Sequence, residues 1–475
     1  MLFHTYTYAV FLPIVLALYA ALNPRGRQIM LLAASYVFYC WVTPWYGFLL
    51  LGSTLLDYYV GLRIEQSHHL RRRRWWLMVS LVGNLGALGF FKYSNFIGEN
   101  VFALASLMGS PRQWEPLDII LPVGISFYTF QTISYSIQVY RRQYPAERDF
   151  VAFALYVSFF PQLVAGPIER ATNLLPQLKR FEPLRWDNIQ AGLARITIGL
   201  FRKLVIADRM SIVVDGAFGD PASCSLGVVW LALFCFYGQL YFDFSGYADI
   251  AIGSARLLGI RLQENFRRPV AASSVIDWWN RWHMTLTGWF RDYLFTTLGG
   301  FKRGRLRAAL NAAVVMALCG LWHGAAWHFV LWGLWCALCI SANYAVRTYF
   351  PKRSDLRANI FIRASRFIAA NALVNLLVII ALLLFRSPDF ETMLTFASAM
   401  IDFNSSGKTF PPYLWIYVAF LFVWYAVEIL LDRTSIAKIL TRLPLPIRAI
   451  GWALLVIVIA LGSVDLRTPY LYFKF

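Results

Sequence analysis

Long apolar runs recur along this chain from one end to the other, and they limit its possible folds more than any other feature. The runs cover residues 8–22, 29–62, 75–91, 94–109, 117–139, 150–166, 187–207, 226–260, 309–345, 366–386 and 413–463. A helix needs about 20 apolar residues to cross a bilayer, so these runs predict an all-α, polytopic membrane protein. Because some runs are long enough for two passes, we expect about 11–13 transmembrane or re-entrant helices.

The composition of the chain agrees with this prediction. Hydrophobic residues make up 59% of the 475 residues and charged residues only 15%, whereas a soluble domain has about 25% charged residues. Polar stretches such as 167–186 and 261–281 are too short to form a separate soluble domain. We therefore predict a single membrane domain over residues 1–475.

The net charge of +19 comes from basic clusters between apolar runs, such as Arg71–Arg74 and Lys352–Arg353. This distribution is typical of cytoplasmic loops, whose neighbours are anionic lipid head groups. No nucleic-acid-binding motif accompanies the charge, so we expect membrane lipids and no nucleic acid as partners. Residues 1–7 contain no Lys or Arg, which predicts an outside N-terminus, with Arg25, Arg27 and the Arg71–Arg74 loop all cytoplasmic. Run 29–62 must then turn back near Pro44.

Cysteine usage indicates neither a metal nor a redox centre. Cys336 and Cys339 form a CxxC pair, but no second pair follows and the surrounding residues are apolar. We interpret them as small buried side chains and predict no metal site.

The densest group of polar residues alternates with four tryptophans between Ser274 and Leu294. Its members are Asp277, Asn280, Arg281, His283 and Thr287. Asp277 and Arg281 stand four residues apart and can pair on a helix. Asn280, His283 and Thr287 form a second polar stripe. Charged side chains at membrane depth are costly and tend to mark functional sites. We therefore predict an interfacial or re-entrant helix that lines a substrate channel, with all five as candidate channel or catalytic residues.

A histidine stands between two glycines in the segment Gly320–Gly324, which separates two apolar stretches. A lone histidine on an apolar face is usually structural, but glycines four residues apart allow a second backbone or a ligand to approach closely. A neutral imidazole, with an ordinary pKa of about 6.5, is also an effective general base. We select His323 as the candidate base and Trp322 as a channel residue. His328 should point elsewhere and is interpreted as structural.

Two carboxylates, Asp243 and Asp249, interrupt the apolar run 226–260. Their spacing of six residues does not place them on one helical face, and Gly246 predicts a bend between them. We keep Asp243 as a candidate channel residue, and expect both carboxylates to pair with Arg281 or Arg291.

Seven segments resemble the membrane-bound O-acyltransferase family, and more narrowly its bacterial branch with the membrane subunit of alginate O-acetyltransferase. They are Leu121–Gln131, Phe160–Ile168, Phe242–Tyr247, Glu264–Phe266, Arg281–His283, Trp289–Leu294 and Trp322–Gly324. Each is weak alone, but seven in this order across nearly the whole chain are specific. The resemblance implies the family's membrane fold, a catalytic role for His323 and a second functional site at His283.

The resemblance also implies a reaction. An acetyl group would pass from cytosolic acetyl-CoA through a funnel in the inner (plasma) membrane, and an extracytoplasmic partner protein would attach it to a polysaccharide such as alginate. Thioester chemistry needs a base and oxyanion donors but no bound cofactor. His323 would be the base, while His283 or Asn280 would orient the acceptor or stabilise the intermediate. D-alanyl or lipid acyl transfer would use the same scaffold, and a secondary transporter is an alternative of another class.

The C-terminal residues Pro469–Phe475 are rich in aromatic side chains. Composition alone indicates an aromatic belt at the membrane interface. The resemblance offers a second interpretation, because similar tails in related systems contain a tyrosine proposed to carry the acyl group. The matching residue is Tyr472. A phenol has a pKa of about 10, low for a hydroxyl, so its ester is readily transferred.

Overall fold

The computed structural model describes the chain except for residues 110–112, 350–358, 404–410, 433–443, 464–469 and 472–475. The chain forms two compact units. One consists of Met1–Ile198 with Tyr247–Glu264, and the other of Gly199–Gly246 with Asn265–Phe475. All regular structure in the described part of the chain is helical, which confirms the predicted all-α class. A single membrane domain over residues 1–475 stays a prediction.

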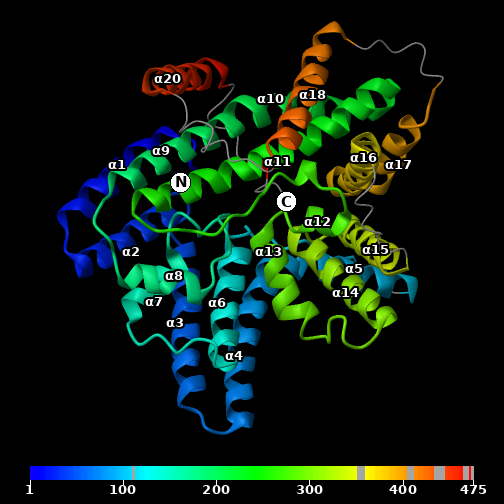
Figure 1. The fold of residues 1–475 in the computed structure, drawn as a ribbon. Coiled ribbons are helices and arrows are strands. Elements are labelled where there is room, and N and C mark those ends of the chain that lie inside the picture. The colour runs from blue at the N-terminus through cyan, green and yellow to red at the C-terminus, as the bar shows by residue number, and fades with distance from the viewer. Residues whose placement is uncertain (110–112, 350–358, 404–410, 433–443, 464–469, 472–475) are drawn as a thin grey trace. The chain divides into compact units, whose positions relative to one another are not determined.

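The first unit contains most of the N-terminal helices (Figure 1). They are α1 (Tyr6–Ala21), α2 (Pro24–Cys40), α3 (Tyr46–Gln66), α4 (Leu70–Leu88), η1 (Gly89–Tyr93), α5 (Ser94–Leu107), α6 (Ile125–Tyr140), α7 (Phe150–Ser158), α8 (Ala171–Lys179) and nearly all of α9 (Trp186–Leu200). Helices α2 and α3 are separated by a turn near Pro44, as predicted. Helix α6 begins directly after Gly124, which adopts a left-handed conformation with φ 83°.

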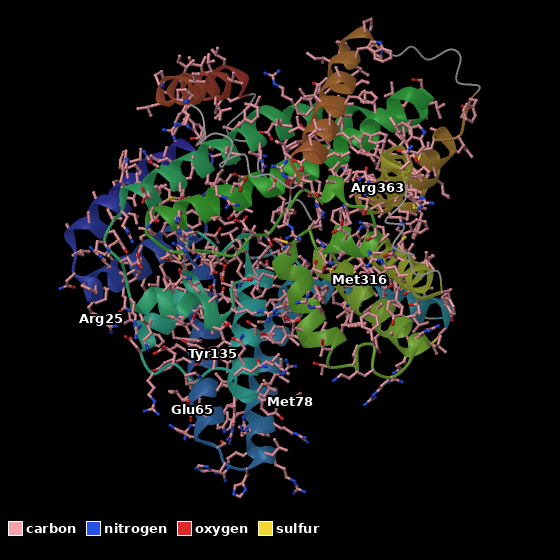
Figure 2. All side chains as sticks on the ribbon, viewed as in Figure 1. Arg25, Glu65, Met78, Tyr135, Met316 and Arg363 are labelled. Carbon is pink, nitrogen blue, oxygen red and sulfur yellow. The ribbon has the colours of Figure 1, made fainter. Side chains whose placement is uncertain are left out.

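Helices α3, α4 and α6 of this unit pack side by side around one buried carboxylate (Figure 1). Asp57 on α3 is fully buried. It accepts hydrogen bonds from Ser80 and from Asn84 Nδ2 (2.6 Å) of α4 and from Ser136 Oγ (2.7 Å) of α6. The outward side of α4 is apolar, as at Met78, which is 53% exposed (Figure 2). A polar interior with an apolar exterior is the arrangement that a bilayer requires.

The second unit contains the remaining elements. They are η2 (Phe201–Ala207), α10 (Asp208–Gly219), η3 (Pro221–Ser223), most of α11 (Leu226–Leu257), η4 (Pro269–Ala271), α12 (Val275–Trp279), α13 (Met284–Trp289), η5 (Phe290–Phe295), α14 (Arg305–His323), α15 (Trp327–Tyr349), α16 (Ile360–Arg386), α17 (Phe390–Ala399), η6 (Pro412–Leu414), α18 (Trp415–Leu430) and α20 (Leu445–Gly462). Helix α15 packs against both α14 and α16. This packing positions the candidate site.

The bend predicted at Gly246 is wrong, because α11 continues without a break from Leu226 to Leu257. The glycine serves close packing instead. A Cβ atom at Gly246 would lie 2.8 Å from the carbonyl oxygen of Gly199, too close for any other residue.

Seven helical segments in the described part of the chain are long and apolar enough to cross a membrane. They are Leu70–Leu107, Leu226–Leu257, Arg305–His323, Trp327–Tyr349, Ile360–Arg386, Pro412–Leu430 and Leu445–Gly462, and Tyr6–Ala21 is a shorter apolar helix. A multi-pass membrane protein is therefore the correct class. The total of about 11–13 transmembrane or re-entrant helices stays a prediction.

Candidate active site

The junction between α14 and α15 places His323 at the end of a helix. Helix α14 ends at His323, and α15 begins four residues later at Trp327. The two helices are in backbone contact, since a Cβ at Gly320 would lie 2.0 Å from the carbonyl oxygen of Phe329. At Gly333 the corresponding distance to the Met316 carbonyl oxygen is 2.1 Å. The predicted close approach of a second backbone at Gly320 is therefore confirmed, and that backbone belongs to α15.

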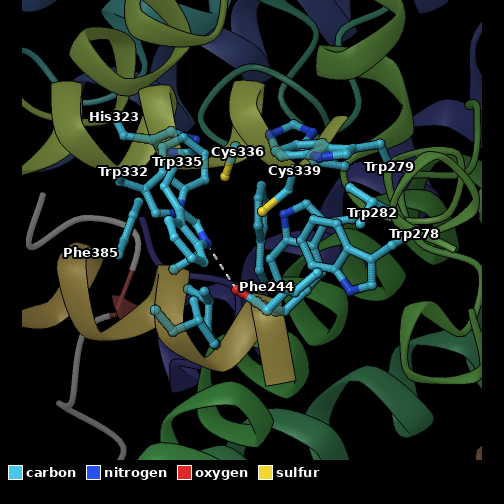
Figure 3. A pocket seen from close by; sticks show the side chains of 17 residues that line it. Phe244, Trp278, Trp279, Trp282, His323, Trp332, Trp335, Cys336, Cys339 and Phe385 are labelled. Carbon is cyan, nitrogen blue, oxygen red and sulfur yellow. Dashed lines mark hydrogen bonds between the residues drawn. The ribbon is translucent and has the colours of Figure 1, made fainter. Parts of the chain in front are cut away.

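Aromatic rings surround the imidazole of His323. Its ring centroid lies 5.1 Å from that of Trp322, 5.1 Å from Trp332 and 5.2 Å from Phe385, all in edge-to-face geometry. Figure 3 shows His323 with Trp332 and Phe385 on one side of a cavity, and Trp278, Trp279 and Trp282 on the other. These contacts restrict the imidazole to one region of the cavity wall.

The polar segment 274–294 does not form the single helix predicted from its spacing. Helix α12 ends at Trp279, and His283 then adopts a left-handed conformation with φ 40° before α13 starts. The backbone here pairs with the preceding loop: Arg267 N donates to Arg281 O and Met284 N to Asn265 O, both at 2.9 Å. These non-local hydrogen bonds replace those of a continuous helix, and no sequence period could reveal them.

Asn265 determines which nitrogen of His283 carries the proton. Thr285 donates its backbone N–H (3.3 Å) and its hydroxyl (2.7 Å) to Asn265 Oδ1, so this atom is an acceptor. His283 Nδ1 lies 3.2 Å from the same oxygen and must therefore donate to it. In the neutral ring, Nε2 is then the acceptor nitrogen. Burial lowers the pKa of His283, in the loop between α12 and α13, to about 3, so the ring is neutral at physiological pH.

Both predicted catalytic histidines line one cavity. The ring of Trp322 is close to both, with its centroid 6.1 Å from that of His283 and 5.1 Å from that of His323. The rest of the lining is almost wholly apolar and comes from α11, α12, α15 and α16 and from Trp282, which lies between α12 and α13. Cys336 and Cys339, predicted to be small buried side chains, are free thiols on this wall. An apolar lining of this kind disfavours water and strengthens the electrostatic interactions beside it.

The other two members of the predicted polar stripe lie elsewhere. Asn280 and Thr287 line a second cavity, together with Arg291 and apolar residues of α14 and α15. The helix break at His283 separates them from the two-histidine cavity. The prediction that Asn280, His283 and Thr287 share one face is therefore wrong.

The predicted pair of Asp277 and Arg281 is present, with Arg281 Nε 2.9 Å from Asp277 Oδ1. Arg281 also forms an ion pair with Asp432. Two carboxylates thus neutralise the guanidinium, and neither Asp277 nor Arg281 lines either cavity among their described wall residues.

The predicted arginine partners of Asp243 and Asp249 are wrong. Asp243 pairs with Lys203, 2.8 Å away, while in the first unit Asp249 pairs with Arg195 at 2.8 Å. Arg291 pairs with its neighbour Asp292. Lys203 was missed by the sequence reasoning, although a lysine inside the apolar run 187–207 was a usable signal.

Tyr472, the proposed acyl carrier, lies outside the described residues. The two residues before it, Tyr470 and Leu471, are described and buried. Asn265 is the other functional residue that sequence reasoning missed. It lay in a quoted motif, but its partner His283 is 18 residues away and only the fold shows their contact.

Residues 145–384 match the family model for the membrane-bound O-acyltransferase family. The chain belongs to this family. The matched range contains His283, His323 and the residues between them. The chain is therefore an acyltransferase.

Several named proteins are similar to this acyltransferase over most of its length. A probable alginate O-acetylase of Pseudomonas syringae pv. tomato is 37% identical over 83% of this chain and 74% of its own. A peptidoglycan O-acetyltransferase of Helicobacter pylori is 36% identical over 68% of this chain and 66% of its own. A teichoic acid D-alanyltransferase of Bacillus subtilis is 28% identical over 51% and 64%.

Proposed function

We propose that this protein transfers acetyl groups from cytosolic acetyl-CoA across the inner membrane, for O-acetylation of an extracytoplasmic polysaccharide such as alginate. The observation that carries the proposal is the buried aromatic cavity with His283 and His323 on its wall. It occurs in a chain that is 37% and 39% identical to probable alginate O-acetylases. Such a cavity suits attack on a thioester, because water would otherwise hydrolyse the donor.

His323 is the general base in this proposal. Its imidazole takes the proton of the acceptor hydroxyl as the oxygen attacks the thioester carbonyl. The tetrahedral intermediate then collapses, the carbon–sulfur bond breaks, and the proton passes from the imidazolium to the thiolate of CoA. General-base assistance of this kind contributes about 10²–10⁴-fold to the rate.

His283 has a different role from His323. Its Nδ1–H is committed to Asn265, so Nε2 presents a lone pair rather than a proton. A lone pair can accept a hydrogen bond from the acceptor hydroxyl but cannot donate one to an oxyanion. We therefore assign to His283 the orientation of the acceptor. Asn280, on the second cavity, is the weaker candidate for this role.

The proposal includes an extracytoplasmic partner protein that passes the acetyl group to the polysaccharide, with Tyr472 as the carrier between the two proteins. The resemblance to the alginate branch supports both assignments. Anionic membrane lipids would contact the basic loops.

Two alternatives use the same scaffold. D-alanyl transfer is supported by a relative with 28% identity, and peptidoglycan acetylation by one with 36% identity. The higher identity of the acetylating relatives favours acetyl as the group transferred. Lipid acyl transfer has no named relative among those compared above, and membership of an acyltransferase family disfavours a transporter.

The proposal is tested by incubating the purified protein in proteoliposomes with radiolabelled acetyl-CoA or with a D-alanyl carrier protein. We expect label transfer from acetyl-CoA only. In cells, His323→Ala should abolish acetyl esters on the secreted polysaccharide without changing the amount of protein in the membrane. His328→Ala is the matched control and should retain activity, while His283→Ala should cause a large partial loss. Equal loss in His323→Ala and His328→Ala, or transfer from the D-alanyl donor alone, would refute the proposal.

A further inference from the structure

Three ionisable side chains meet in the interior of the second unit. Lys203 on η2 is 1% exposed, and its Nζ lies 2.8 Å from both Asp208 Oδ1 and Asp243 Oδ1. We refer to these three residues as the Lys203 cluster. Buried charges are costly in a membrane protein, so such a cluster is a strong indication of a function.

Two described residues near the C-terminus, Tyr470 and Leu471, contact this cluster. The backbone N–H of Leu471 donates a hydrogen bond of 2.8 Å to Asp243 Oδ2, whereas the 2.8 Å contact with Lys203 is made by Asp243 Oδ1. The Nζ of Lys203 lies 4.8 Å from the ring centroid of Tyr470, a cation–π distance. Tyr470 is 1% exposed and Leu471 7% exposed. Both residues are therefore held inside the unit, although chain ends are usually disordered.

We propose that the Lys203 cluster is a docking site for the chain's own C-terminal end, with Asp243 as its anchor. Asp243 is the cluster member that contacts both Lys203 and the backbone of the tail. The ammonium group of Lys203 lies 2.8 Å from Asp243 Oδ1, and hydrogen bonds within an ion pair of this kind are stronger than those between neutral groups. The Tyr470 ring covers the ammonium group. Recognition of a backbone N–H and a ring face requires the tail to follow one path.

The anchor lies next to the active-site cavity. Asp243 is followed on α11 by Phe244, which lines the two-histidine cavity and whose ring centroid lies 4.7 Å from that of His283. Tyr472 follows Leu471 directly in the chain. Asp243 and Lys203 are then positioning residues for the acyl carrier. This positioning role rests on the proposed function, whereas the anchoring of Leu471 by Asp243 does not depend on it.

Digestion of the full-length protein from its C-terminus tests the anchor. In detergent, carboxypeptidase Y should stop at Leu471 in the wild type, as followed by intact mass. Asp243→Ala removes the acceptor of the Leu471 hydrogen bond but leaves Lys203 paired with Asp208. Asp208→Ala is the matched control, because it also removes one carboxylate from Lys203 but keeps the contact with Leu471. A hydrogen bond to a charged group changes an equilibrium by roughly tenfold to a hundredfold. We expect digestion past Leu471 to accelerate at least about tenfold in Asp243→Ala and to change little in Asp208→Ala.

Equal rates of digestion for Asp243→Ala and wild type would overturn the anchor. Equally accelerated digestion of Asp243→Ala and Asp208→Ala would overturn it as well, since Asp243 would then act only through general packing.

The positioning role is tested with Leu471→Pro, which lacks the donating N–H, against Leu471→Ala, which keeps it. Neither substitution alters the cluster. Acetyl transfer should fall at least about tenfold in Leu471→Pro and remain within a few-fold of wild type in Leu471→Ala. Full transfer by Leu471→Pro overturns the positioning role. A wild type that transfers no acetyl refutes the proposed function, and the digestion still decides the anchor.

Discussion

Replacing Gly320 by alanine should damage both the packing and the catalysis of the second unit. The added Cβ would lie 2.0 Å from the carbonyl oxygen of Phe329, where an ordinary contact needs at least 3.4 Å. The obstacle is backbone, which cannot rotate away as a flexible side chain can. Helices α14 and α15 must therefore separate by roughly 1.4 Å at this point.

Two opposing terms determine the free energy of unfolding of Gly320→Ala. Overpacking costs about 1–3 kcal/mol, while alanine gains at most about 1 kcal/mol over glycine within a helix. Because the clash involves backbone, we expect the steric term to exceed the helix term, with a net loss of about 2 kcal/mol. The catalytic effect should be larger. His323 lies one turn after Gly320 on α14, and a displacement of about 1 Å can cost 10²-fold in rate.

Thermal unfolding in detergent and label transfer from acetyl-CoA measure the two effects separately. Gly216→Ala is the matched control. Gly216 also lies within a helix of the second unit, but its Cβ would meet no atom within 4 Å. That variant should be as stable as the wild type or more stable, by about 0.5–1 kcal/mol. A Gly320→Ala protein with wild-type Tm and transfer rate would show that α14 and α15 are not in backbone contact.

Three further predictions concern other parts of the chain. Tyr472→Phe should abolish polysaccharide acetylation, whereas Tyr470→Phe should be tolerated because it keeps the ring that covers Lys203; full activity of Tyr472→Phe would leave only a belt role for the tail. Asp57→Ala should lower the stability of the first unit by about 3 kcal/mol, since buried hydrogen-bond donors of α4 and α6 lose their acceptor; an unchanged Tm would contradict this. Arg72→Cys should react with impermeant maleimide only from the cytoplasmic side, and labelling from outside in intact cells would reverse the predicted topology.

The sequence predicts correctly those features that depend on neighbouring residues. The membrane class follows from the length of the apolar runs. The turn between α2 and α3 follows from Pro44, and the ion pair of Asp277 with Arg281 follows from a four-residue spacing. In each case the residues responsible lie within one or two helical turns. Interactions between neighbouring residues are sufficient to predict these features.

The errors arise where a distant segment decides the local structure. The expected bend at Gly246 is absent, because this glycine accommodates the backbone of Gly199 instead of breaking α11. The partner of Asp243 is Lys203, 40 residues earlier, rather than an arginine of the next polar segment. A single sequence contains no signal for such pairings, and the fold is needed to find them.

The most consequential error concerns the helix break at His283, and it leads to a final prediction. In a continuous helix, His283 would share a face with Asn280 and Thr287, which line the second cavity. Hydrogen bonds from the loop around Asn265 interrupt the helix and bring His283 to the cavity of His323. Asn265 and His283 should therefore act as one unit.

Asn265→Ala should lower acetyl transfer about as much as His283→Ala, because the ring loses both its orientation and its preferred tautomer. The double variant should be scarcely worse than either single one, since groups that act together are strongly non-additive. Thr285→Ala is the control, because it removes one donor to Asn265 Oδ1 but leaves the backbone N–H of residue 285 to hold that oxygen. Multiplicative losses in the double variant would mean that Asn265 serves the fold independently of His283. The neutral acceptor role assigned to His283 Nε2 would then lose its structural basis.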